Sequence, residues 1–129
     1  MIFARKMVLD KASLAYLNRV TIIIIPIYNI GGSLLRNSTS RVNQNGPMAY
    51  GFRGNRQNLD LNRDFIKCDS KNAKTFSNIF NQWNPDILID NHTSDGADYT
   101  YNITLLASQR NKLNVILGDY MYNKFIPSI

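Results

Sequence analysis

Residues 20–27 read VTIIIIPI, a run of β-branched residues that is followed by the turn sequence Asn29 to Gly32. Val and Ile favour strands, and an uninterrupted apolar run of this length is typical of a strand that is buried on both faces. Before it, apolar residues recur at helical spacing between Met7 and Leu17. A helix followed by a buried strand predicts an α/β fold, in which helices flank a mixed or parallel sheet.

Four regular elements are predicted further along the chain. A helix is expected over Lys71 to Trp83, capped by Asp69 or Ser70 and ended by Pro85. The other three are a second buried strand over 86–90, a third strand over 99–107 and a helix from Asp119 to Phe125. Before these four elements, residues 31–62 are rich in Gly, Asn, Ser and Arg and are predicted to be mostly loop. Loops of this length usually carry function, so we expect the binding surface there.

Composition limits the class of protein. The 129 residues are 44% hydrophobic and 19% charged, a globular balance that fits one domain or part of one. The net charge is +6, but the fifteen Lys and Arg residues are spread in ones and twos, so we expect no nucleic-acid partner. A basic nucleic-acid adaptor stays as an alternative that the charge alone motivates. We also expect no secretory signal and no membrane partner, because a membrane helix needs about 20 apolar residues.

The stretch Arg53 to Phe65, RGNRQNLDLNRDF, carries the candidate site together with His92. Arg63 and Asn62 place a guanidinium beside an amide, and a guanidinium forks two hydrogen bonds onto a carboxylate. His92 is the only histidine, and it follows the predicted strand over 86–90. Because ligands bind at the carboxyl ends of strands in α/β sheets, this histidine is predicted to share a cleft with the loop.

The order of these features resembles the zinc carboxypeptidase (metallocarboxypeptidase) family. Arg53 comes first, then Asp60-x-Asn62-Arg63, a helix, an apolar strand and His92 at the end of that strand. The resemblance implies zinc-dependent proteolysis, the hydrolysis of a peptide or amide bond next to a free C-terminal carboxylate. It also implies an incomplete zinc-carboxypeptidase-like sheet within a partial domain over residues 1–129.

The resemblance further implies a role for each site residue. Asn62 and Arg63 bind the terminal carboxylate of the substrate, and Arg53 polarises the scissile carbonyl, with Arg41 and Arg56 as weaker candidates for that role. His92 is a zinc ligand, and Asp60 orients a zinc-bound histidine.

The chain departs from the family in its metal chemistry. It has no His-x-x-Glu motif and no catalytic Glu, because all nine acidic residues are Asp. We therefore expect the zinc site to be incomplete and this chain alone to be inactive. The resemblance leaves two expectations, a fragment of a carboxypeptidase or a non-catalytic module that binds peptide C-termini. Exposed edges of the incomplete sheet are expected to cause self-association.

Simpler interpretations of the same residues stay open. His92 can be satisfied by Asp90, Arg63 and Asp64 can form an ordinary surface ion pair, and Asp60 can be a turn residue. The single Cys68 allows no disulfide within the chain and is expected to be a reduced, inert thiol.

Overall fold

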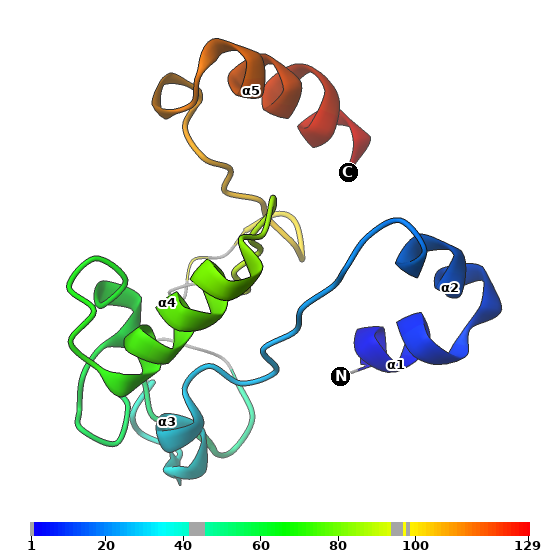
Figure 1. The fold of residues 1–129 in the computed structure, drawn as a ribbon. Coiled ribbons are helices and arrows are strands. Elements are labelled where there is room, and N and C mark those ends of the chain that lie inside the picture. The colour runs from blue at the N-terminus through cyan, green and yellow to red at the C-terminus, as the bar shows by residue number, and fades with distance from the viewer. Residues whose placement is uncertain (1, 42–45, 94–96, 98) are drawn as a thin grey trace. The chain divides into compact units, whose positions relative to one another are not determined.

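The computed structural model describes residues 2–41, 46–93, 97 and 99–129, and it divides at residue 96 into two compact units (Figure 1). The first unit contains most of the regular structure. Its elements are α1 (Ile2–Leu9), α2 (Lys11–Leu17), α3 (Ile30–Leu34), β1 (Arg36–Asn37), β2 (Tyr50–Gly51), the 3₁₀ helix η1 (Leu61–Arg63) and α4 (Lys71–Trp83). Candidate residues Arg53, Asp60, Asn62, Arg63 and His92 all belong to this unit.

The predicted α/β sheet is wrong. In the described part of the chain the only sheet is the antiparallel pair β1 and β2, with Arg36 opposite Gly51 and Asn37 opposite Tyr50. Residues 20–27, 86–90 and 99–107 are not strands. Where the described residues are regular they are mostly helical, and they form no mixed or parallel zinc-carboxypeptidase-like sheet. The reason is that β-branched composition favours a strand only where a neighbouring strand pairs with it.

The first predicted helix is interrupted. Asp10 has an extended backbone, and its carboxylate accepts hydrogen bonds from the Ala12 amide at 3.3 Å and the Ser13 hydroxyl at 2.7 Å. An Asp side chain that bonds nearby backbone amides competes with a continuous helix. As a result α1 ends at Leu9 and α2 begins at Lys11.

The helix predicted over Lys71–Trp83 is confirmed as α4. Its N-cap is Ser70, whose hydroxyl accepts a hydrogen bond from the Ala73 amide at 3.0 Å. At the other end, Asn84 takes a left-handed backbone with φ 42°, which closes the helix before Pro85. These boundaries depend on local chemistry, which is why the sequence predicts them.

Aromatic rings pack α4 against the segments that precede it. Phe76 contacts Tyr28 and Phe65 edge to face, with ring centroids 5.9 and 5.3 Å apart, and Phe80 adds a fourth ring. The side-chain amide of Asn72 also donates to the Tyr28 carbonyl oxygen at 3.0 Å.

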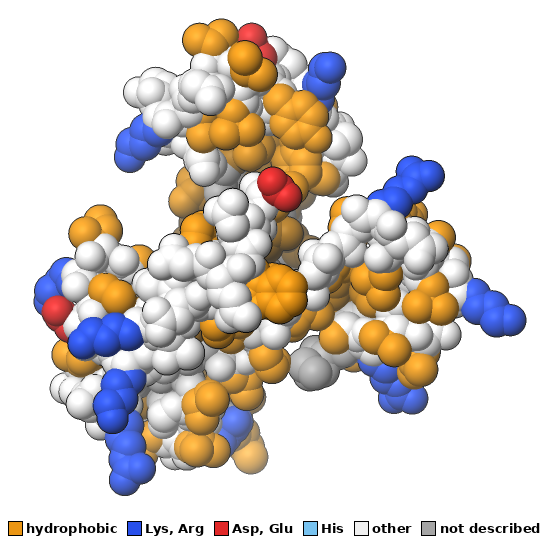
Figure 2. Space-filling view, in the orientation of Figure 1, with side chains coloured by type: hydrophobic (Ala, Val, Ile, Leu, Met, Phe, Trp, Pro, Cys, Tyr) orange, Lys and Arg blue, Asp and Glu red, His pale blue; other side chains and the backbone are white. Residues whose placement is uncertain are grey.

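Many large apolar side chains outside this aromatic cluster are exposed to solvent. Figure 2 shows apolar side chains over much of the visible face.

The predicted loop over residues 31–62 contains short elements held by one asparagine. Asn29 caps α3 through its side-chain oxygen, which accepts from the Gly32 amide at 2.9 Å. Its side-chain nitrogen lies 3.3, 3.1 and 3.1 Å from the carbonyl oxygens of Phe52, Arg53 and Gly54. Gly32 leaves no room for a larger residue, since a Cβ there would lie 2.4 Å from the Phe52 oxygen. Asn29 therefore anchors the backbone at Arg53.

The second unit is a short helical segment. It comprises the 3₁₀ helix η2 (Arg110–Lys112), α5 (Val115–Tyr120), a π-helical turn over Met121–Phe125 and a 3₁₀ turn over Ile126–Ser128. The helix predicted from Asp119 is therefore present but begins earlier. Arg110 and Asp119 form an ion pair within this unit. Over the residues described, no helix is both long and apolar enough to cross a membrane.

Candidate functional site

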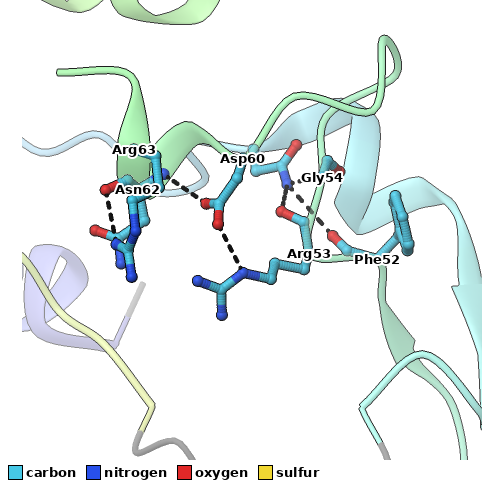
Figure 3. Close-up of polar contacts among 7 residues, drawn as sticks. Phe52, Arg53, Gly54, Asp60, Asn62 and Arg63 are labelled. Atoms are coloured by element: carbon cyan, nitrogen blue, oxygen red, sulfur yellow. Dashed lines mark hydrogen bonds and ion pairs between the residues drawn. The ribbon is translucent and has the colours of Figure 1, made fainter. Parts of the chain in front are cut away.

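Asp60 is the centre of the candidate site. One carboxylate oxygen lies 2.9 Å from Nε of Arg53, and the other accepts a hydrogen bond from the Asn62 amide at 3.0 Å. The second bond makes Asp60 the N-cap of η1. The same carboxylate therefore holds a cation and the turn that carries Asn62 and Arg63, as Figure 3 shows.

The pKa of Asp60 reflects this position. Partial burial raises the pKa of the carboxyl, but the hydrogen bonds from the Arg53 guanidinium and the Asn62 amide outweigh burial and hold it below the ordinary 3.8. The positive charges of Arg53 and Arg63 act in the same direction. Asp60 is consequently ionised at neutral pH, as an acceptor for a guanidinium must be.

Arg53 is fixed at both its backbone and its side chain. Its carbonyl oxygen accepts from the Asn29 amide, and its guanidinium bonds Asp60 (Figure 3). The side chain still keeps 40% of its surface accessible to solvent. A cation held in this way loses little further conformational freedom when an anion binds beside it.

Asn62 and Arg63 are presented to solvent by η1. Leu61 at the start of η1 is buried, with 3% of its surface exposed, and so is Asp64 just after the helix, with 5% exposed. Positions three apart lie on one face of a 3₁₀ helix, so the two residues between them face outward. Arg63 Nη1 donates to the Asn62 carbonyl oxygen at 3.1 Å, which folds the guanidinium back over the turn.

Asp64 does not form the surface ion pair that was one interpretation of the sequence. Its carboxylate accepts from the backbone amides of Asp69 and Ser70, both at 2.9 Å. The Ser70 hydrogen bond, followed by that from Asp69, holds the pKa of Asp64 below its ordinary value. Asp64 therefore orders the start of α4, and it is part of the scaffold of the site.

His92 lies on a different segment and contacts Asp90. Its Nε2 is 2.8 Å from the Asp90 carboxylate, and both side chains are about half exposed. The alternative in which Asp90 satisfies His92 is thus confirmed, although neither residue is on a strand. Among the residues described, no hydrogen bond or ion pair joins His92 to Asn62 or Arg63.

A catalytic zinc takes three protein ligands, and the described side chains around His92 do not by themselves supply them. His92 and Asp90 offer two donors, and they bond each other. Asp60, expected to orient a zinc-bound histidine, instead contacts a guanidinium and a backbone amide. In the described ranges no three His, Cys, Asp or Glu side chains are grouped to hold a metal ion.

Two asparagines shape the site and are not predicted from the sequence to do so. Asn29 holds the backbone of Arg53, and Asn55, which is 6% exposed, accepts from the amides of Gln57 and Leu59 at 2.9 and 3.0 Å. Asn55 thereby shapes the turn that leads into Asp60. The available signal was that Asn favours turns and caps, but the chain is rich in Asn and nothing local singles out these two.

Comparison with known proteins identifies no relative. No protein-family description matches the chain, and no curated protein or solved structure is significantly similar to it.

Proposed function

We propose that the cluster Arg53, Asp60, Asn62 and Arg63 binds the free C-terminal carboxylate of a peptide or related amide substrate. The activity proposed for the site is hydrolysis of the adjacent bond, as in the zinc carboxypeptidases that the motif resembles. The observation that supports binding is the hydrogen-bonded connection from Arg53 through Asp60 to the turn at Asn62 and Arg63. This connection places the guanidinium groups of Arg53 and Arg63 and the side-chain amide of Asn62 near the ionised carboxylate of Asp60.

Charge favours an anionic ligand. Two arginines against one aspartate leave the cluster with a formal charge of +1 at neutral pH. Arg63 and Asn62 are exposed, and a guanidinium with a neighbouring amide matches the two oxygens of a carboxylate. Arg53 would lie beside the carbonyl next to that carboxylate and stabilise negative charge on its oxygen.

A second candidate is a non-catalytic module that binds peptide C-termini. It is favoured by the partner of Asp60, which is Arg53 itself. Arg53 is therefore oriented by a carboxylate of the same loop. Both candidates predict the same carboxylate binding and differ in whether a bond is cleaved.

Binding can be tested with a fluorescent hexapeptide prepared with a free C-terminus and with a C-terminal amide. The free acid should bind more tightly, and Arg63→Ala should weaken its binding by about tenfold to a hundredfold, because a hydrogen bond to a charged group contributes about 1.5–3 kcal/mol. Arg56→Ala is the matched control, since Arg56 is also exposed on the same loop. Equal affinity for acid and amide would refute the proposal.

Cleavage needs a separate measurement. Release of the terminal amino acid, followed by chromatography with and without added Zn²⁺, distinguishes the hydrolase from the binding module. Release that requires Arg53 supports hydrolysis, whereas tight binding without release supports the module.

A further inference from the structure

Most of the positive charge of this chain lies between Arg36 and Lys74. The stretch contains eight of the fifteen Lys and Arg residues but only three of the nine Asp residues, so its formal charge is +5 out of a total of +6. It includes η1 and the start of α4. Figure 2 shows several Lys and Arg side chains over this part of the first unit, at the lower left of the view. A surface with this charge attracts anionic ligands.

The three Asp side chains of the stretch already bond to groups of the same stretch. Asp60 pairs with Arg53 and Asp69 pairs with Lys67, each at 2.9 Å. Asp64 is buried and accepts hydrogen bonds from two backbone amides. The negative charges of the stretch are therefore held by particular partners, and most of its cations are left over.

Three of the remaining cations lie on η1 and α4. Arg63, Lys71 and Lys74 are all exposed. Among the described residues, no ion pair includes any of the three. Lys71 and Lys74 are three positions apart on α4, so they are neighbours on the surface of the helix. These cations can accept anionic groups from a ligand.

Two hydrogen bonds hold the start of α4 against the candidate site. The carboxylate of Asp64, next to Arg63, accepts from the backbone amide just before Lys71 at 2.9 Å. The loop before η1 contacts the same helical turn, since Nδ2 of Asn55 lies 3.4 Å from Oδ1 of Asn72. Lys71 lies between the two residues of α4 that make these contacts, and its backbone is therefore fixed beside the turn that presents Arg63.

We infer that the carboxylate site selects peptides that carry Asp or Glu side chains in the last few residues before the free C-terminus. This inference rests on the proposed function, in which Asn62 and Arg63 bind the terminal carboxylate. Lys71 and Lys74 then bind the acidic side chains that precede it. An extended peptide advances about 3.3 Å a residue, so its last three or four residues span about 10–13 Å. The ligand class is thus an acidic peptide with a free C-terminus.

An acidic peptide fits this surface better than a nucleic acid does. Asp60 and Asp69 keep 34% and 55% of their side chains exposed, and they alternate with the cations along the sequence. A nucleic acid carries a negative charge on every phosphate, so it brings like charges toward these carboxylates. A peptide can place neutral residues beside them.

Three fluorescent hexapeptides test the inference on the full chain. They share the same C-terminal residue with a free carboxylate, and they carry Glu, Gln or Lys at the three preceding positions. The Glu peptide should bind at least about fivefold more tightly than the Gln peptide, because each exposed ion pair changes affinity by about two- to fivefold. The Lys peptide should bind most weakly. The preference for Glu should shrink as salt rises from about 0.05 to about 0.5 M.

Charge-removing substitutions locate the preference on the chain. Lys71→Gln and Lys74→Gln should each lower the ratio of Glu-peptide to Gln-peptide affinity by about two- to fivefold. Lys124→Gln is the matched control, because it removes the same charge from an exposed position in the second unit. Circular dichroism checks that each variant is folded. An equal effect of Lys124→Gln would assign the preference to net charge and overturn the role of α4.

The results separate this inference from the proposed function. Equal affinity for the Glu and Gln peptides, with the free acid still bound more tightly than the C-terminal amide, would overturn the selectivity and leave the carboxylate site intact. A preference for Glu without any difference between acid and amide would support the acidic-peptide surface and refute the carboxylate site. A single-stranded oligonucleotide that binds as tightly as the Glu peptide would overturn the choice of a peptide.

Discussion

Nε of Arg53 lies 2.9 Å from a carboxylate oxygen of Asp60, seven residues further along the chain. This ion pair connects the backbone held by Asn29 with the turn that presents Asn62 and Arg63. The ion pair orients the residues of the candidate site. It joins two partly exposed side chains, so it does not require a large hydrophobic core. The ion pair is partly exposed, with 40% and 34% of the two side chains accessible to solvent, so its effect on stability is small.

Arg53→Ala is therefore expected to separate binding from stability. The free energy of unfolding should change by less than about 1 kcal/mol, because an exposed ion pair contributes little. Peptide hydrolysis, or peptide binding if no bond is cleaved, should fall more than it does for Arg41→Ala. Urea denaturation together with peptide titration measures both effects, and a large loss of stability would show that Arg53 is chiefly structural.

Ser70→Ala should destabilise α4. Its hydroxyl accepts a hydrogen bond from the Ala73 amide at 3.0 Å, and Ser70 is 1% exposed. Loss of an N-cap costs about 1 kcal/mol, measurable by urea denaturation followed by circular dichroism. Ser77→Ala in the middle of the same helix is a suitable control, because its contact is a long one of 3.6 Å to Cys68 Sγ. Equal effects would argue against the capping role.

Acid should weaken the first unit. The pKa values of Asp60 and Asp64 are lower than the ordinary 3.8, owing to the hydrogen bonds each carboxylate accepts. A carboxyl whose pKa is lower in the folded chain stabilises the fold above its unfolded pKa, and this stabilisation is lost as pH falls through the folded pKa. The urea midpoint should thus be nearly constant down to about pH 5 and fall below about pH 4.

Asp64→Asn tests the cause of this acid sensitivity. The variant should be less stable at neutral pH, and its stability should depend less on pH below about pH 4 because one titrating group is gone. An undiminished acid transition in Asp64→Asn would locate the cause elsewhere.

Tyr28→Phe is expected to preserve or increase stability. The Tyr28 hydroxyl is buried and has no hydrogen-bond partner among the residues described, while its ring stacks on Phe65 with centroids 5.7 Å apart. Removing a buried unpaired hydroxyl should change the free energy of unfolding by between zero and about 1 kcal/mol in the stabilising direction. Tyr28→Ala provides the contrast, since it also removes the ring and should be clearly destabilising. A destabilised Phe variant would indicate a hydrogen bond to the hydroxyl in solution.

Elements with local causes were predictable from the sequence. The helix Lys71–Trp83 follows from its apolar spacing, the Ser70 cap and Pro85, all within a few residues of one another. The proximity of Asp60, Asn62 and Arg63 is equally local, because an Asp cap brings them together over one turn. What the sequence by itself determined was therefore a capped helix and a compact group of polar side chains.

Only the tertiary structure decided the remainder. Whether residues 20–27 form a strand depends on a partner that their own composition does not specify, and no strand among the described residues pairs with them. Asp64 bonds the start of α4, and Arg53 bonds Asp60. These contacts likewise depend on which groups the folded chain brings within hydrogen-bonding distance. Local hydrogen bonds are encoded by neighbours in sequence, whereas sheet pairing and burial depend on contacts between distant segments.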